Sequence, residues 1–419
     1  MKKFALFTFV LVLLLPLLGT AMAKTSLEVW IMQPGNQDVE KLLAQAKADF
    51  QAKNPEVEVN LQFVPWLSAW QKITTAVAGG EAPDVCELGT TMTPFYADMG
   101  ALLDMTKYVQ AWGYAKDLDP GVLESAVMDE KLFGVPWYAG ARALVYRKDW
   151  FAEAGIKSPP KTWDEFLAAA KAIQQVDKNG KVIRYGFAFQ GNGRLTWLPF
   201  IWQNGGEIGY KKDGKWVSGM NSPEAIEAIR FYADLLLKHK LSPEASVTWS
   251  ALNARQAFAL GTCGMLIEGP WGLPPIYNAN PEIASKIGVC LLPGKKKMAT
   301  FVGGSNLVVF KQSRQKDLAA EFVHLLMGDK YQLELAKMLK FFPGRVSLQD
   351  DTAFKSDPIL KVFAEQMKYG RSLPAAPGWG SIEKLDVPGV MLQKILTGQM
   401  SVEQAAAWAA EKMNDLFNP

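Results

Sequence analysis

The sequence predicts an α/β fold that is divided into more than one domain. Segments with the alternation of a β-strand and segments with the periodicity of an α-helix follow one another along the chain. The length of 419 residues exceeds what one hydrophobic core usually supports, and a content of 49% hydrophobic and 21% charged residues is typical of a folded protein. This alternation implies a parallel sheet covered by helices, and such sheets bind ligands at the loops beyond their carboxyl ends.

The N-terminal part of the pattern has the order β-α-β-α-β. The strands are short and apolar or alternate apolar with polar residues, and the helices carry apolar residues at helical spacing. Asn54-Pro55 ends the first helix, and Gly79-Gly80 ends the second. These features predict strands over 27–32, 57–63 and 85–88, and helices over 38–53 and about 68–78.

The rest of the chain continues this alternation without an internal repeat. Thr162 and Glu165 form a capping box that begins a helix reaching about residue 175. Ser222 and Pro223 begin a helix that runs to about residue 239. Further strands are predicted over 143–146, 185–189, 265–268, 288–292 and 307–310, and further helices over 197–202, 316–327 and 401–417.

Residues 1–23 predict a cleavable signal peptide and therefore a periplasmic protein. Lys2 and Lys3 precede an apolar run over 4–18, and Ala21-Met22-Ala23 is a small-x-small cleavage site. The alternative, an uncleaved anchor, is disfavoured because the run is short for a membrane span. Cleavage leaves 396 residues with 43 basic and 42 acidic side chains. This near-neutral charge argues against nucleic acid or an anionic membrane as partner.

The sequence contains no motif for metal, phosphate or nucleophilic chemistry. HExxH, GxSxG, the P-loop and the dinucleotide fingerprint are all missing, and both histidines, His239 and His324, fall within predicted helices. We therefore expect no catalytic residues, no metal and no cofactor. A secreted glycosidase stays open as an alternative, because its two carboxylates pair in space and not in sequence.

Three cysteines, Cys86, Cys263 and Cys290, are too few and odd in number for a disulfide scaffold. Each lies in an apolar, strand-like context that predicts a buried free thiol. A Cys263–Cys290 bridge is the alternative in an oxidising compartment.

A series of motifs in a fixed order connects the chain with a known family. None of the motifs is specific alone, but together they cover essentially the whole mature chain. On them the sequence resembles the extracellular solute-binding proteins of ABC sugar importers. The matching segments include Phe50 to Val59, Gly79-Gly80-Glu81-Ala82-Pro83-Asp84-Val85, Gly134-Val135-Pro136, Leu144 to Asp149, Pro160 to Phe166, Asn204-Gly205-Gly206, Gly269-Pro270-Trp271 and Phe341 to Arg345.

The resemblance implies two α/β lobes of the type II-like periplasmic binding protein fold, discontinuous in sequence and joined by a hinge. We expect lobe one over 24–139 and 297–342, and lobe two over 140–296 and 343–419. The implied function is the capture of a sugar or oligosaccharide by hinged closure, followed by delivery to a membrane ABC permease. The protein is expected to act as a monomer. Alternatives on the same fold are a polyol, glycerol phosphate or peptide ligand.

Sugars present apolar C–H faces and a rim of hydroxyls, so a receptor needs flat aromatic rings and planar polar groups. The 14 Trp and 11 Tyr residues fit this need. A single arginine among the candidate loops favours a neutral sugar over a phosphate. The aromatic candidates are Trp271, Trp379, Trp197 and Trp66, and the polar candidates are Arg142, Gln33, Asn36, Thr90, Thr91, Gly304, Ser305 and Glu268.

Some of these candidates have structural alternatives. Trp197 can equally be a core residue of its helix. Arg142 stands before the strand that begins lobe two, where its guanidinium can hold two hydroxyls or form a salt bridge at the hinge. Glu268 faces either the ligand or the opposite side of its strand. A carboxylate occupies the position resembling Thr91 in the maltose-binding protein of this family, which argues against maltose as the ligand.

Overall fold

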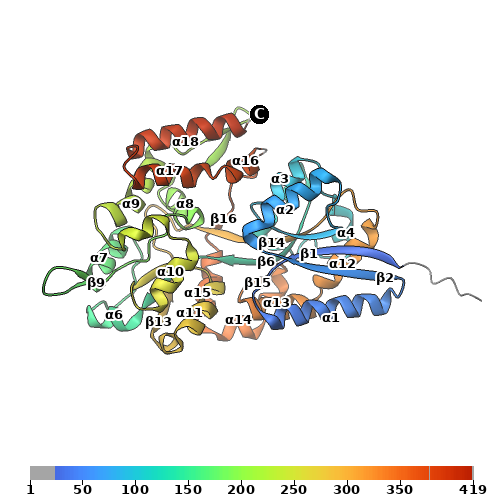
Figure 1. Ribbon diagram of the computed structural model, residues 1–419, viewed down its shortest axis with the longest axis horizontal. Helices are drawn as coiled ribbons and strands as arrows, with labels where there is room; N and C mark the ends of the chain where they lie inside the picture. The colour runs from blue at the N-terminus through green and yellow to red at the C-terminus, as the bar shows by residue number, and fades with distance from the viewer. Residues whose placement is uncertain (1–23, 377, 418–419) are drawn as a thin grey trace, which may run out of the picture.

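A large and a small β-sheet, each covered by helices, organise the chain into two halves that lie side by side (Figure 1). The computed structural model describes residues 24–376 and 378–417, so the predicted signal peptide lies outside the described residues. Within these residues the large sheet has the order β15-β6-β14-β3-β1-β2, with β16 paired to β14, and the small sheet has the order β12-β7-β13. The large sheet comprises β1 (Thr25–Met32), β2 (Val57–Val64), β3 (Val85–Gly89), β6 (Val135–Ala141), β14 (Thr300–Val309), β15 (Phe342–Pro343) and β16 (Gly370–Arg371).

The small sheet comprises β7 (Ala143–Arg147), β12 (Met265–Glu268) and β13 (Ile287–Cys290). Short hairpins join β4 (Val127–Met128) to β5 (Lys131–Leu132), β8 (Gln175–Val176) to β9 (Val182–Arg184), and β10 (Gly209–Lys212) to β11 (Lys215–Ser218). In the large sheet β1 pairs in parallel with β2 and β3, as the alternation of elements predicts. Strand β14 instead runs antiparallel to β3 and β6. It joins the sheet from far along the chain, so local alternation could not predict its direction.

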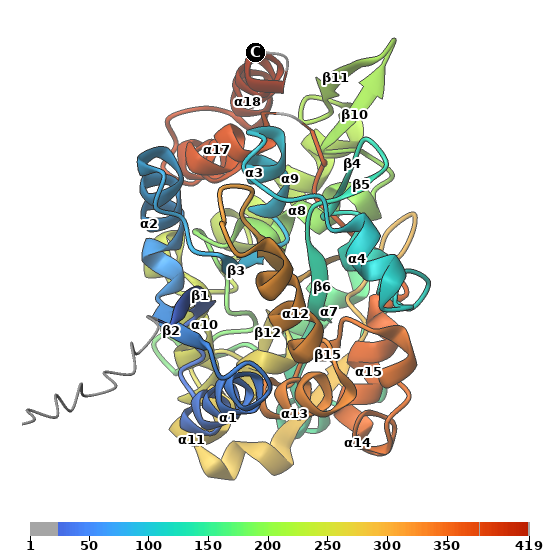
Figure 2. The same ribbon diagram turned by 90° about the vertical axis from the view of Figure 1, so that its right-hand side faces the viewer.

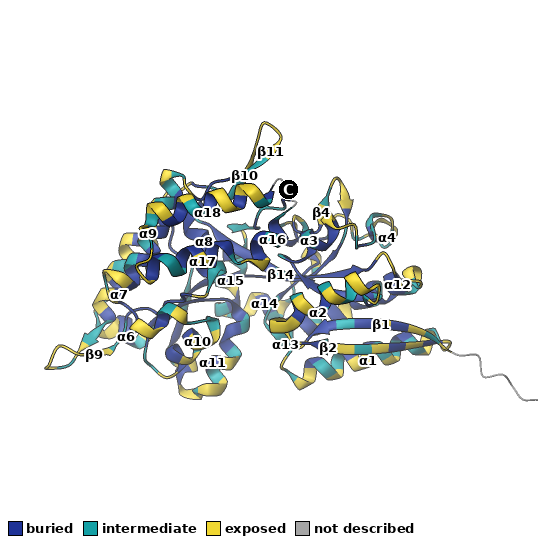
Figure 3. Cartoon of the chain, turned by 45° about the horizontal axis from the view of Figure 1, so that its top comes forward, coloured by how far each residue is buried: buried dark blue, intermediate teal, exposed yellow. Residues whose placement is uncertain are grey.

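Helices cover the sheets and bury their apolar faces inwards (Figure 3). The half with the large sheet contains α1 (Gln37–Lys53), α2 (Trp66–Gly79), α3 (Thr93–Asp98), α4 (Thr106–Ala111), α5 (Pro120–Leu123), α12 (Lys316–Leu326) and α13 (Asp329–Leu339). The other half contains α6 (Lys148–Glu153), α7 (Trp163–Ile173), α8 (Arg194–Gln203), α9 (Pro223–Leu237), α10 (Ala251–Ala259), α11 (Leu273–Ala279), α16 (Trp379–Lys384), α17 (Val387–Leu396) and α18 (Val402–Phe417).

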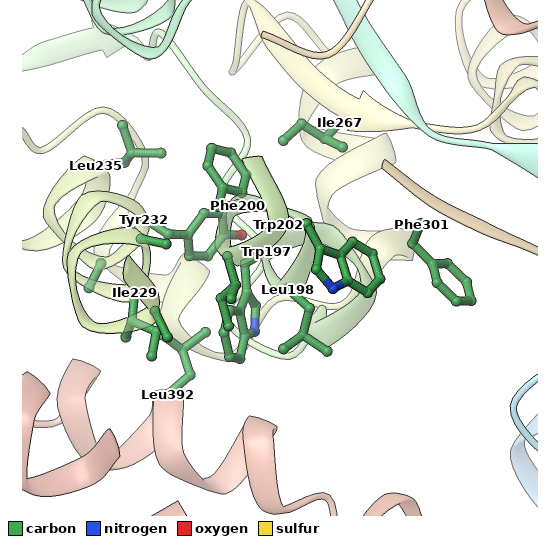
Figure 4. Close-up of a cluster of buried hydrophobic side chains, with 14 of the residues drawn as sticks. Trp197, Leu198, Phe200, Trp202, Ile229, Tyr232, Leu235, Ile267, Phe301 and Leu392 are labelled. Carbon is green, nitrogen blue, oxygen red and sulfur yellow. The ribbon is translucent and has the colours of Figure 1, made fainter. Parts of the chain in front are cut away.

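Two further helices, α14 (Thr352–Ser356) and α15 (Pro358–Met367), and the 3-10 turns η1 (Glu244–Thr248), η2 (Pro270–Gly272), η3 (Pro281–Lys286) and η4 (Val346–Leu348) complete the described elements. Each half has its own core. Trp197, Phe200 and Trp202 of α8 pack against α9 and α17 in the half with the small sheet (Figure 4). Leu27 and Val29 of β1 pack with α1 and α12 in the other half, which Figure 2 shows from its own side. In the described ranges no helix combines the length and the apolar character that a bilayer crossing requires.

Most of the predicted strands and helices are confirmed, including the capping box of Thr162 and Glu165. The strand predicted over 185–189 is wrong. Only Tyr185 forms a bridge, to Cys263, and β9 ends one residue earlier. Phe187 and Ala188 donate their N–H groups to the carbonyls of Leu241 and Met265, so within the described residues the segment bonds to two separate places and not to one continuous strand.

The bridge considered between Cys263 and Cys290 is also wrong, because both cysteines are free thiols. Cys290 lies in β13, and Cys263 stands just before β12. Strand β7 lies between β12 and β13, pairing with both of them. An intervening strand holds its two neighbours about 10 Å apart, which is too far for a disulfide.

The chain passes from one sheet to the other where β6 ends and β7 begins, and only Arg142 separates the two strands. Ala141 pairs there with Val302, and Thr300 pairs with Gly370. The Thr300 hydroxyl donates a hydrogen bond of 2.8 Å to the carbonyl of Arg142. Extended segments from three distant parts of the sequence therefore run beside one another at the junction of the halves.

Candidate functional site

A cavity of about 950 Å³ lies between the two halves. From the half with the large sheet it is lined by the loops beyond the carboxyl ends of β1 and β3, which is the position expected for a parallel sheet. From the other half it is lined by residues of α8, α10, η2, α11 and α16. Its volume falls at the upper end of the roughly 300–1,000 Å³ typical of ligand sites.

The cavity brings together nine of the twelve residues that the sequence singles out. They come from the loop after β1, the loop after β3, the start of α2, the junction of β6 with β7, the middle of β14, and η2. Trp66 is 46% exposed at the start of α2, whereas Thr90 is buried. The nine residues are Gln33, Asn36, Trp66, Thr90, Thr91, Arg142, Trp271, Gly304 and Ser305.

The other three, Trp197, Trp379 and Glu268, do not line the cavity. Trp197 is 1% exposed inside the core of its own half (Figure 4). Trp379 is 2% exposed and stacks on Phe417 of α18, with ring centroids 6.2 Å apart. Glu268 is 1% exposed and forms an ion pair with Arg255, with 2.5 Å between Oε2 and Nε. Only Trp197 is turned wholly into the core of its own half. Trp379 borders a separate small pocket with Thr90 and Thr91, and the Glu268 carboxylate is paired with a residue of the cavity wall.

Trp271 forms an aromatic wall of the cavity. Its ring lies parallel to that of Phe341, with centroids 4.6 Å apart and an interplanar angle of 7°. The sequence explains how the indole fits, because a Cβ atom added at Gly140 would lie 2.5 Å from the Trp271 ring. The absence of a side chain at Gly140 therefore lets the indole rest on the backbone of β6.

Arg142 lies beside this wall without forming the salt bridge considered for it. Its guanidinium carbon is 5.3 Å from the Trp271 ring centroid and 5.9 Å from that of Phe301. Among the described residues, its side chain has neither a hydrogen-bond acceptor nor an ion-pair partner. A planar group with five N–H donors thus faces the cavity between two aromatic rings.

Comparison with known proteins identifies the family. The family described as bacterial extracellular solute-binding protein matches residues 34–333. The chain belongs to this family.

Individual relatives of this solute-binding protein support the family assignment. The diacetylchitobiose-binding protein DasA of Streptomyces coelicolor is 31% identical over 400 residues, which cover 94% of this chain and 90% of DasA. An ABC transporter solute-binding protein of Thermotoga lettingae, solved with α-D-tagatose, is 27% identical with a TM-score of 0.82, covering 94% of this chain and all of that one. Maltose-bound MalE3 of T. maritima is 26% identical with a TM-score of 0.79, over 93% and 100% of the two chains. The expected two-lobe α/β fold is thereby confirmed.

The structure adds cavity residues of the solute-binding protein that the sequence did not indicate. Glu87 of β3 is buried and accepts hydrogen bonds from the Tyr138 hydroxyl and, at 2.9 Å, from the Met32 N–H. The Ser305 hydroxyl in turn donates to Tyr138 at 3.0 Å. Burial raises the pKa of Glu87 above its ordinary value, and these hydrogen bonds oppose the shift. A glutamate inside an apolar strand was the one sequence signal available.

Glu383 of α16 is a second buried carboxyl on the cavity wall. It accepts hydrogen bonds from the Arg194 guanidinium and, at 2.8 Å, from the Thr91 hydroxyl. Burial raises its pKa, against the pull of Arg194. Thr91 and Glu383 lie in different halves, so this contact spans the cavity. Within the ranges that the structure describes, no three His, Cys, Asp or Glu side chains gather as a candidate metal site.

Proposed function

We propose that the protein captures a sugar or oligosaccharide in this cavity by hinged closure and delivers it to an ABC import permease. The observation that carries the proposal is that aromatic and polar residues from both halves line one cavity of about 950 Å³. Trp66 and Trp271 offer ring surfaces for the C–H faces of a sugar, and Arg142 with Thr90 and Thr91 offers hydrogen bonds to its hydroxyls. The diacetylchitobiose, tagatose and maltose named for the relatives support a carbohydrate ligand.

The crossing segments give this proposal its hinge. The strands on either side of Arg142, β6 and β7, belong to separate sheets, and Thr300 and Gly370 pair with each other close to this junction. Bending at these three points would move the halves as rigid bodies. Arg142 and Thr300 support the lobe boundaries proposed near 139/140 and 296/297. The pairing of β16 with β14 supports a further crossing between the lobes near residue 370, beyond the boundary proposed at 342/343. A ligand held by both halves favours the closed form by the difference of its affinities for the two forms.

The remaining parts of the proposal follow from the family. The signal peptide over 1–23 would place the protein in the periplasm, where it would act as a monomer beside its membrane permease. The two buried carboxyls of the cavity, Glu87 and Glu383, are hydrogen-bonded to hydroxyl or arginine groups of the protein. We therefore assign them to ligand binding and propose no catalysis.

A thermal-shift screen against a carbohydrate panel tests the proposal, followed by titration calorimetry on any sugar that raises the melting temperature. Trp271→Ala should weaken binding of that sugar by about tenfold to a hundredfold, since a ring face buried on the ligand is lost. Trp112→Ala is the matched control, because Trp112 also stacks in parallel, on His324 at 4.8 Å and 5°, but lies outside the cavity. Loss of binding in both variants, or small-angle scattering that no sugar changes, would contradict the proposal.

A further inference from the structure

Arg142 is a charged group of the cavity wall to which no residue within 24–376 and 378–417 offers an acceptor. Its guanidinium lies between the rings of Trp271 and Phe301. Burying a charge is costly unless it is paired and hydrogen-bonded, and closure of the halves would bury Arg142 further. Its free donors therefore call for an acceptor that comes with the ligand.

The acidic residue beside Arg142 is already used by a second arginine. Pairing of β7 with β12 sets Glu268 opposite Ala143, the residue after Arg142. Glu268 accepts hydrogen bonds from Arg255 at 2.5 Å and from the Gly269 N–H at 2.9 Å. Arg142 and Arg255 both line the cavity, and the Glu268 carboxylate pairs with Arg255 alone. This wall therefore carries one positive charge that its described residues do not balance.

The other carboxyls of the cavity do not supply that balance. Glu87 is hydrogen-bonded to Tyr138, which lies four residues before Arg142, or about 13 Å along an extended strand. Glu383 is held by Arg194, which also contacts Asp386 at 3.1 Å. Each of these carboxyls has donors from the protein, whereas Arg142 has no acceptor among the residues that the structure describes.

We infer that the cavity selects a carbohydrate that bears a carboxylate, a uronic-acid sugar, and that Arg142 holds this carboxylate through paired N–H donors. The inference rests on the proposed function and replaces the neutral sugar expected from a single arginine, because folding adds Arg255 to the site. A planar guanidinium matches a carboxylate in a two-hydrogen-bond geometry. A phosphate would bring nearly two negative charges to a wall with one positive charge to offer, so the charge balance favours the carboxylate.

Titration calorimetry on three matched sets of ligands tests the inference: uronic-acid disaccharides, their methyl esters, and the corresponding neutral disaccharides. The free acid should bind about tenfold to a hundredfold more tightly than its ester, as expected for a charge-assisted hydrogen-bonded pair. The ratio should shrink at high salt. A sugar phosphate of the same configuration forms a fourth arm.

Arg142→Gln should reduce the acid-to-ester ratio to near one, and Arg142→Lys should retain part of it, since the charge remains but the planar fork is lost. Arg230→Gln is the matched control: it removes the same charge from an exposed helix position paired with Glu403, and it should keep the full ratio. Neutral sugars or esters that bind as tightly as the acids would overturn the inference and leave the proposed function standing. Tighter binding of the sugar phosphate would also overturn it. Binding of no carbohydrate at all would refute both.

Discussion

Replacing Trp379 by alanine tests whether this indole serves packing or ligand binding. The side chain is 2% exposed and stacks on Phe417, with 6.2 Å between ring centroids and an angle of 24°. Truncating a buried tryptophan to alanine costs about 3–5 kcal/mol, because transfer free energy is lost and a cavity remains. Within the described residues the indole Nε1 has no hydrogen-bond partner, so Trp379→Phe breaks no hydrogen bond. We expect that change to cost roughly 1.5 kcal/mol, from lost volume alone.

Urea unfolding, followed by tryptophan fluorescence and by circular dichroism, measures both free energies of unfolding. Sugar affinity is measured in parallel on the folded variants. The expected order is a large loss for alanine, a small loss for phenylalanine, and an affinity of the Phe variant within about threefold of the native protein. A Trp379→Ala variant that kept its stability but lost sugar binding would refute the reasoning, because the indole would then contact ligand.

Three further predictions concern the cavity wall. Gly140→Val should weaken sugar binding more than about tenfold in calorimetry, because its Cβ would lie 2.5 Å from the Trp271 ring and displace it; unchanged affinity would contradict this. A double-mutant cycle of Trp271→Ala and Phe341→Ala should give a coupling of about 0.5–1.5 kcal/mol in unfolding free energy, and a value near zero would exclude the stacked pair. Burial raises the pKa of Glu87, so the stability that its protonated form contributes is complete below the ordinary glutamate pKa of 4.5 and is lost as pH rises through the higher pKa of the folded state. The free energy of unfolding should therefore fall more steeply above pH 4.5 in the native protein than in Glu87→Gln. Equal slopes in the two proteins would contradict this assignment.

Local patterns predicted most of the secondary structure and the loops that form the site. Helical spacing, strand alternation and end signals such as Asn54-Pro55 act over a few residues, so they can be read from the chain. The loops after β1 and β3 followed from the rule that ligands bind beyond parallel strands, and they do line the cavity. The strand predicted over 185–189 was wrong because the backbone partners of this segment, Leu241 and Met265, are remote in sequence.

The choice among tryptophans shows the limit of local reasoning. Trp271 and Trp379 both stand in a Gly- and Pro-rich context, and nothing near them separates the two. Trp379 is buried because Phe417, far along the chain, covers it, whereas Trp271 lies against Gly140 at the cavity. Exposure of a side chain depends on which distant elements pack against it, and tertiary structure alone decides that.

By itself the sequence determined the α/β class, the order of the elements, and a cavity wall of aromatic and hydroxyl side chains. The tertiary structure decided the electrostatics. Arg142 and Glu268 are set beside each other by the pairing of β7 with β12, and Arg255 reaches them from α10. Charges interact through distances in space, which the sequence does not contain, so the unbalanced positive charge on the wall became visible only when the fold brought the three groups together.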